Sequence, residues 1–311
     1  MRLLVTGADG FVGRHLVRRL TEDGHSVGAA CRPGGRGVDW GDRDVTPVSL
    51  ELTDDASVRE AVGYGPDAVI HLAAVASNRE AHADPGLAWT VNAAGTARLA
   101  EALGRRMAEG SRIRLLVVSS GEVYGPGPTA PRRETDSVAP STPYAASKAA
   151  SELAGLEVWR RTGLPVMIAR PFTHTGPGQD TRFALPAFAE RMREARATGA
   201  TRVRSGNLAP VRDLLDVRDV VDAYVRLVTS GEPGETYNIA RGEGNTMREL
   251  FDRIADLVGV RVEPEPEPSL ARPSDIPHLV GDSAKLRRAT GWAPTRSLEG
   301  TLRGLVDAQA D

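Results

Sequence analysis

Short apolar runs alternate with amphipathic segments through the first half of the chain. The runs are rich in Val, Ile, Leu and Ala, which is typical of strands buried on both faces. The segments between them repeat apolar residues every three or four positions, as a helix with one buried face does. The predicted strands are Leu3–Thr6, Ser26–Cys31, Ala68–Leu72, Leu115–Ser119 and Val166–Ala169. The predicted helices are Phe11–Asp23, Ala56–Val62, Trp89–Glu109 and Pro143–Thr162.

This alternation predicts an α/β fold built on a parallel sheet with helices on both faces. Because crossover connections are right-handed, a Rossmann-type doubly wound parallel sheet is the simplest topology. We expect residues 1–169 to form this dinucleotide-binding domain. Residues 170–311 are expected to form a smaller, mixed α/β substrate domain, with segments near 213–240 returning to the sheet.

The second half of the chain is interrupted by joints rich in Pro and Gly. One strand is predicted over 234–240, and the alternating Glu-Pro run in 263–273 is expected to be a stiff, solvated extended segment without chemistry of its own. The predicted helices are Phe183–Thr198, Val217–Thr229, Met247–Val258 and Asp282–Thr290.

Composition excludes several classes of function. Among 311 residues, 39 basic and 41 acidic side chains nearly cancel, so no net field recruits nucleic acid or an anionic membrane. The lone Cys31 cannot form an internal disulfide, and no apolar run reaches the length of a membrane span. We expect a soluble cytoplasmic protein that binds neither nucleic acid nor membranes.

A glycine-rich loop joins the first strand to the first helix. Glycines at positions 7, 10 and 13 permit a tight turn and a close approach of backbone to a diphosphate. The start of the following helix offers free N–H groups and a positive dipole end to that charge. This context predicts a dinucleotide site contacted by Gly7, Asp9, Gly10, Phe11, Val12 and Gly13.

The end of the second strand indicates which dinucleotide binds. An acidic residue there would hold the ribose diol of NAD, but the sequence has Arg32, with Arg36 shortly after it. A guanidinium can donate two hydrogen bonds to a 2′-phosphate, which a carboxylate would repel. The sequence therefore favours NADP (as NADPH) over NAD.

Polar residues follow the buried strand that ends near residue 118. A second set of polar residues lies at the start of the helix predicted from residue 143. Tyr144 and Lys148 are four residues apart, so they share one helical face, and Ser120 and Glu122 follow the strand. We expect the Lys148 ammonium to lower the pKa of the Tyr144 phenol, which starts near ~10. Such a tyrosine can exchange a proton with a substrate oxygen near neutral pH.

The whole chain resembles the extended short-chain dehydrogenase/reductase family. The resemblance rests on the glycine loop, residues 71–74 ("HLAA"), Asn92, Ser120 and the Tyr144–Lys148 pair. It implies that Ser120 orients the substrate oxygen, that Tyr144 is the acid/base, and that Lys148 binds the nicotinamide ribose. It further implies cofactor contacts by Arg32, Glu51, Leu52, Leu72, Ala73, Ala74, Tyr144, Lys148 and Pro171; at 51 the family more often has Asp.

Three later stretches, 169–179, 206–224 and 272–292, look like the GDP-sugar branch of that family. This likeness implies that Arg212 and Arg272 hold the substrate diphosphate, because paired guanidinium groups suit it. It also implies that Asp275 accepts a ribose diol. Thr173 stands where these relatives commonly have Asn. The substrate contacts implied are Ser77, Ser120, Glu122, Thr173, Arg212, Arg272 and Asp275, with no metal site.

Within this branch the resemblance is closest to reductases, and it implies NADPH-dependent reduction of the C4 ketone of GDP-4-dehydro-6-deoxy-D-mannose to GDP-6-deoxy-D-mannose (GDP-D-rhamnose). A 4,6-dehydratase could use Glu122 as its base. However, Gly121 stands where such enzymes carry Asp or a hydroxyl residue. A 4-epimerase and a non-catalytic dinucleotide sensor remain alternatives. The family often dimerises through two helices, here Trp89–Glu109 and Pro143–Thr162, whose outward faces we expect to carry Ala97, Leu103, Leu153 and Leu156.

Overall fold

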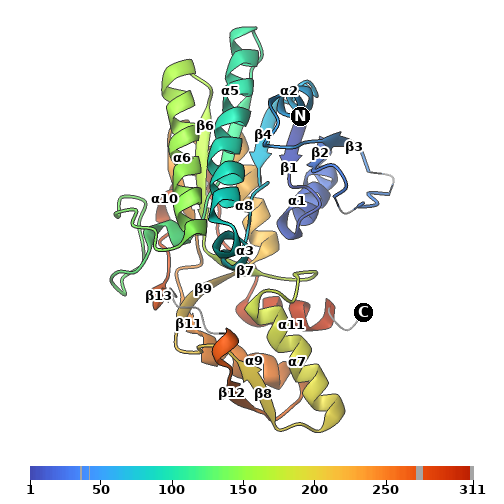
Figure 1. Ribbon diagram of the computed structural model, residues 1–311, viewed down its shortest axis with the longest axis vertical. Helices are drawn as coiled ribbons and strands as arrows, with labels where there is room; N and C mark the ends of the chain where they lie inside the picture. The colour runs from blue at the N-terminus through green and yellow to red at the C-terminus, as the bar shows by residue number, and fades with distance from the viewer. Residues whose placement is uncertain (36, 42, 271–275, 309–311) are drawn as a thin grey trace.

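A seven-stranded parallel sheet forms the larger part of the computed structural model, which describes residues 1–35, 37–41, 43–270 and 276–308 (Figure 1). The strand order is β10-β6-β5-β4-β1-β2-β3, so the chain winds outward from β1 in both directions. This confirms the predicted doubly wound α/β fold. The strands are β1 Arg2–Thr6, β2 Ser26–Cys31, β3 Val45–Ser49, β4 Ala68–His71, β5 Arg114–Val118, β6 Val166–Pro171 and β10 Thr236–Ile239.

Helices cover both faces of this sheet because the inner strands are apolar on both sides. On one face α1 (Phe11–Glu22) and α8 (Val217–Ser230) bury Leu, Val and Ala side chains against β1, β5 and β6. On the other face lie α2 (Asp55–Val62), α5 (Gly95–Ala108) and α6 (Pro143–Thr162). Helix α10 (Ala284–Thr290) adds Leu286 to the first face.

A smaller unit lies below the carboxyl ends of the strands (Figure 1). Its core is formed by α7 (Ala184–Thr198), α9 (Met247–Val258) and α11 (Leu298–Ala308). Two small sheets complete it. The pair is β8 (Arg202–Ser205) with β12 (Glu263–Pro266), and the four-stranded group is β7 (Thr173–Thr175), β9 (Val211–Asp216), β11 (Gly244–Thr246) and β13 (His278–Leu279).

Several predicted boundaries are wrong for identifiable reasons. The predicted helix Trp89–Glu109 is a π-helical turn, η1 Trp89–Ala94, continued by α5. Within the Glu-Pro stretch, Glu263–Pro266 is extended, as predicted, but it pairs with β8 as strand β12 and is not merely solvated. Pro268–Leu270 instead form a short 3-10 turn, and 271–273 lie outside the described residues. Not predicted were the strands β3, β7, β8, β9, β11 and β13, the helix α11, the short helices α3 (Asn78–Ala83) and α4 (Pro85–Ala88), and the short turns η2 (Gly121–Tyr124) and η3 (Pro268–Leu270).

Two of the four residues expected on the outward faces of α5 and α6 contact the core instead, and one of them, Leu156, is partly buried against it. Leu103 is fully buried in the core beneath α5, so it cannot take part in a contact with a second subunit. Leu153 of α6 is 67% exposed, and Leu87 and Trp89 next to it in the fold are also exposed apolar residues. In the described part of the chain, no helix combines the length and the apolar character that crossing a bilayer requires.

Candidate active site

The glycine loop lies between the carboxyl ends of β1 and β4, where the backbone has no room for side chains. Gly7 has a φ of +67°, and a Cβ there would lie 3.0 Å from the backbone of Ala73. A Cβ at Gly13 would lie 2.2 Å from the carbonyl oxygen of Gly7. Both positions therefore require glycine. The loop packs onto the backbone of Leu72 and Ala73, two of the residues expected to contact the cofactor.

The start of α1 fits the phosphates of a dinucleotide. Gly10 is its N-cap and contributes no side-chain hydrogen bond to the first turn. The N–H groups of Phe11, Val12 and Gly13 consequently have no side-chain cap, and the positive end of the helix dipole adds to them. This arrangement suits a diphosphate held by backbone donors.

Thr6 connects the loop to the neighbouring strand through a buried network that the sequence analysis missed. Its hydroxyl oxygen accepts hydrogen bonds from the backbone N–H groups of Leu72 (3.1 Å) and Ala73 (3.0 Å). Its proton is therefore donated to Nδ1 of His71, 2.8 Å away. His71 then carries its proton on Nε2, which donates to Thr96 at 3.1 Å. Burial lowers the pKa of His71 to about 3, with Lys148 contributing, so the ring is neutral.

The second strand ends beside the same loop. Cys31 lies near Asp9, and burial together with Asp9 raises the pKa of the thiol to about 11. Arg32 is exposed at the strand end, so its guanidinium is accessible. Glu51 accepts hydrogen bonds from the backbone N–H and hydroxyl of Thr53, and these hydrogen bonds, with a contribution from Arg32, lower the pKa of the carboxyl. Leu52 is buried against α5.

Ser120, Glu122 and Tyr144 meet beyond the end of β5. Ser120 begins the short helix η2, where its hydroxyl accepts the backbone N–H of Glu122, and its side chain also hydrogen-bonds to Tyr144. The expected lowering of the Tyr144 pKa is wrong. Burial raises that pKa and the nearby Glu122 carboxylate raises it further, while the Ser120 hydrogen bond acts in the opposite direction. Desolvation and the carboxylate dominate, and the phenol is protonated at neutral pH.

Lys148 lies one helical turn after Tyr144 on α6, and only 6% of it is exposed. The helix is fixed at its start by Thr142, whose hydroxyl accepts the N–H of Ala145, and by Pro143 in its first turn. Burial lowers the pKa of Lys148 to about 8, although Glu152 opposes this shift. The ammonium is thus charged at neutral pH but loses its proton in mild alkali.

Asn78 is a further residue near the site that the sequence analysis did not identify. Its amide donates a 2.7 Å hydrogen bond to Oε2 of Glu122, which helps to fix the position of the carboxylate. Ser77, expected to contact substrate, caps helix α3 by accepting the N–H of Glu80. No signal in the linear sequence pairs Asn78 with Glu122, since they come from separate strand ends.

Only some of the residues expected to bind the substrate lie in the described part of the chain. Arg212 lies on β9 and donates to the carbonyl oxygen of Ile276 at 2.7 Å. Thr173 is half-buried on β7, which pairs with β9, and Pro171 ends β6. His174 stacks on Phe11 and hydrogen-bonds to the carbonyl of Phe172. Arg36, Arg272 and Asp275 lie outside the described residues.

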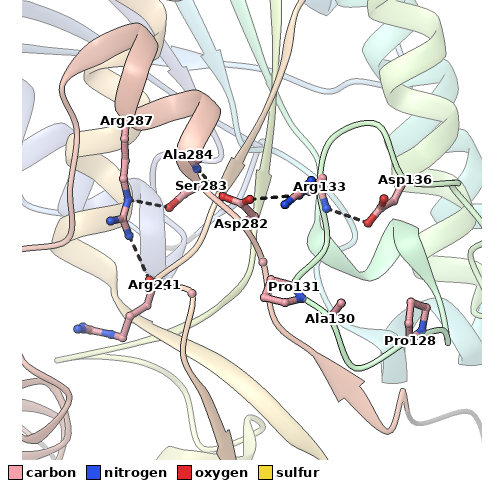
Figure 2. Close-up of a pocket in the computed structure, with 12 residues that line it drawn as sticks. Pro128, Ala130, Pro131, Arg133, Asp136, Arg241, Asp282, Ser283, Ala284 and Arg287 are labelled. Carbon is pink, nitrogen blue, oxygen red and sulfur yellow. Dashed lines mark hydrogen bonds and ion pairs between the residues drawn. The ribbon is translucent and has the colours of Figure 1, made fainter.

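A separate pocket of about 590 Å³ lies between the loop near Pro131 and the start of α10 (Figure 2). Neither Ser120 nor Tyr144 lines it. Its charged groups are already engaged: Arg133 pairs with Asp282 at 3.4 Å, and Arg287 donates to Ser283. We therefore place the chemistry at the strand ends and not in this pocket. Over the residues that the structure describes, no cluster of His, Cys, Asp and Glu could hold a metal ion.

Comparisons with known proteins agree with this geometry. The model of the NAD dependent epimerase/dehydratase family matches residues 3–240. The chain is 36% identical to GDP-6-deoxy-D-mannose reductase of Pseudomonas aeruginosa, over 98% of this chain and 96% of that protein. It is also 36% identical to UDP-glucose 4-epimerase of Mycolicibacterium smegmatis, over 96% and 95% of the two chains. The solved structure of RMD from Pseudomonas aeruginosa complexed with NADPH matches with a TM-score of 0.83 at 34% identity, covering 99% of this chain and 98% of that one.

Proposed function

The chain belongs to the NAD dependent epimerase/dehydratase family, the extended short-chain dehydrogenases/reductases, and within it we propose that the protein is an NADPH-dependent reductase of a nucleotide-linked 4-keto sugar. The substrate we propose is GDP-4-dehydro-6-deoxy-D-mannose, and the product is GDP-6-deoxy-D-mannose. The likeness to GDP-6-deoxy-D-mannose reductase supports this choice.

The observation that carries the proposal is the protonated phenol of Tyr144 beside Ser120. Reduction of a ketone creates an alkoxide, which needs a proton donor at the moment it forms. Burial and Glu122 keep the proton on Tyr144, and Ser120 hydrogen-bonds to the same side chain. The phenol is therefore the protonated group next to Ser120, and the Lys148 ammonium one helical turn along α6 would stabilise the phenolate once the proton has moved.

Each residue of the site has a separate role in this reaction. The nicotinamide cofactor supplies the hydride to C4 when it is bound along the glycine loop. Ser120 donates a hydrogen bond to the C4 oxygen and orients it, and Tyr144 transfers its phenolic proton to that oxygen. The Lys148 ammonium, one turn along α6, stabilises the phenolate that remains. Arg212 on β9 would hold the diphosphate of the substrate.

The alternative 4,6-dehydratase activity has one specific observation in its favour, the Glu122 carboxylate next to Tyr144. The space around Gly121 argues against it. A Cβ at Gly121 would lie 3.1 Å from the ring of Phe172, so an acid at this position would require Phe172 to move. At Gly121 the site therefore carries no second acid that would help expel water. A 4-epimerase is distinguished only by assay.

The cofactor proposal rests on Arg32. Its exposed guanidinium at the end of β2 lies where the 2′-phosphate of NADP is expected, and the match to an NADPH-bound structure supports it. We further propose that the enzyme is a cytoplasmic homodimer. Leu153, Leu87 and Trp89 form an exposed apolar surface over α4, η1 and α6, which a second copy could cover. Sedimentation showing a monomer at micromolar concentration would contradict the dimer.

The activity is tested by mixing the protein, NADPH and GDP-4-dehydro-6-deoxy-D-mannose and following NADPH absorbance. We expect the absorbance to fall and GDP-6-deoxy-D-mannose to appear. A constant absorbance would contradict the reductase. In a parallel incubation with GDP-mannose and no reductant, a ketosugar product would identify a dehydratase instead. Competition by the UDP- and dTDP-linked sugars tests the choice of base.

A further inference from the structure

A buried ion pair lies behind the active site, one helical turn beyond Lys148. The Glu152 carboxylate on α6 accepts two hydrogen bonds from Arg170 on β6, from Nε at 2.9 Å and from Nη2 at 2.6 Å. Only 6% of either side chain is exposed. The Ser119 hydroxyl donates a third hydrogen bond to Oε1 at 2.5 Å. Bidentate pairing with a third donor fixes the position of the carboxylate.

This pair connects the elements that carry the catalytic groups. Ser119 directly precedes Ser120, and Glu152 shares a helical face with Lys148. Arg170 also donates to the hydroxyl of Tyr124 at 2.9 Å, and Tyr124 ends the turn that contains Glu122. A change in this ion pair would therefore affect the end of β5, the turn η2 and helix α6, which carry Ser120, Glu122 and Lys148.

The charges around Lys148 come from few groups. His71 on β4 is neutral, and Tyr144 on its own helix is protonated. Glu152 is the carboxylate whose charge raises the pKa of Lys148 against the effect of burial. Arg170 neutralises part of the field of Glu152, since the two form an ion pair.

We propose that Glu152 is a positioning residue for Lys148: its carboxylate, held by Arg170 and Ser119 one helical turn along α6, fixes a negative charge on the helical face that carries the buried Lys148 ammonium. Arg170 sets how much of that negative charge Lys148 experiences. The inference rests on the proposed role of Lys148 in the reductase, but its test does not need turnover.

The chain offers a direct measurement because it contains only two lysines, Lys148 and Lys285. NMR of protein labelled with isotopes in lysine gives one titration curve for each, with neither cofactor nor sugar present. Lys285 pairs with Glu235 near the surface and serves as the internal reference. Any variant can thus be compared at Lys148 while Lys285 reports general changes.

Two substitutions should move the Lys148 titration in opposite directions. Glu152→Gln removes the negative charge and leaves Arg170, so the midpoint should fall by about one pH unit. Arg170→Gln leaves Glu152 unneutralised, so the midpoint should rise. Ser119→Ala changes no charge and removes one of the three hydrogen bonds to the carboxylate, so it should move the midpoint much less than either charge variant. A purely structural pair would shift both charge variants in the same direction or in neither, and that result would overturn the proposal.

Removing one member of a buried ion pair can prevent folding. Glu152→Asp keeps the pair neutral overall while drawing the carboxylate back by one methylene. It should fold and lower the Lys148 midpoint by a smaller amount; an unchanged midpoint would contradict the proposal. With substrate present, the alkaline limb of the kcat/KM profile should shift as the midpoint does. If the NMR shifts appear but no variant or wild-type protein reduces the ketosugar, the proposed function fails and the positioning role of Glu152 stands.

Discussion

Replacing Thr6 tests whether its hydroxyl joins the glycine loop to the neighbouring strand. Thr6 is fully buried and makes three hydrogen bonds, from the N–H groups of Leu72 and Ala73 and to Nδ1 of His71. Thr6→Val preserves the shape and removes all three. Each buried polar group left without a partner costs about 1–3 kcal/mol. Since the three groups share one site, we expect a total loss of about 3 kcal/mol in the free energy of unfolding.

Thr6→Ser is the matched control. It keeps the hydroxyl and removes one buried methyl group, which costs about 1 kcal/mol. Urea unfolding should therefore rank wild type, Thr6→Ser and Thr6→Val in falling order of stability, with about 2 kcal/mol between the two variants. NADPH should bind more weakly to Thr6→Val, because Leu72 and Ala73 border the loop. If both variants are equally stable, the hydroxyl does not hold the strand ends together.

Four further substitutions test the cofactor site and the charge state of the buried His71. In Gly13→Ala the new Cβ would lie 2.2 Å from the Gly7 carbonyl oxygen, so the loop must change its geometry. Fluorescence titration should then show NADPH affinity falling at least about tenfold. Gly37→Ala is the control, because a Cβ at Gly37 would have no atom within 4 Å, and it should bind NADPH normally. Arg32→Ala should lower kcat/KM for NADPH and leave kcat/KM for NADH unchanged. Equal losses for both cofactors would argue against a 2′-phosphate contact. Because burial lowers the pKa of His71 to about 3 from 6.5, its contribution to stability is present above pH 6.5 and is lost as the pH falls toward 3, by about 1.4 kcal/mol per pH unit. Urea unfolding at several pH values should show a smaller dependence of stability on pH between 6.5 and 3 in His71→Asn than in wild type.

The strands and helices around the cofactor were predictable because local signals mark them. Helix α6 begins and ends as predicted, since Thr142 caps it, Pro143 opens it and Gly163 closes it with a φ of +78°. Strand β3 was missed because it lies at the sheet edge, contains Pro47 and is mostly exposed, so it lacks the apolar pattern of the inner strands.

The spacing of Tyr144 and Lys148 marked the candidate site, but not its electrostatics. The pKa of Tyr144 rises because of burial and Glu122, and Glu122 reaches it from a different strand end. The pairing of Glu152 with Arg170 joins a helix to the strand that follows it, and neither residue carries a motif that announces the contact. Such pairings depend on the tertiary fold and cannot be obtained from spacing alone.

The most direct test compares wild type with Tyr144→Phe in the NADPH-dependent reduction of the GDP-linked 4-keto sugar. The substitution removes the phenolic proton and little else. We expect kcat to fall by about 10³-fold, within the range for loss of a general acid, while the Kd for NADPH is unchanged. Turnover close to that of wild type would show that the proton reaches the sugar oxygen from another group.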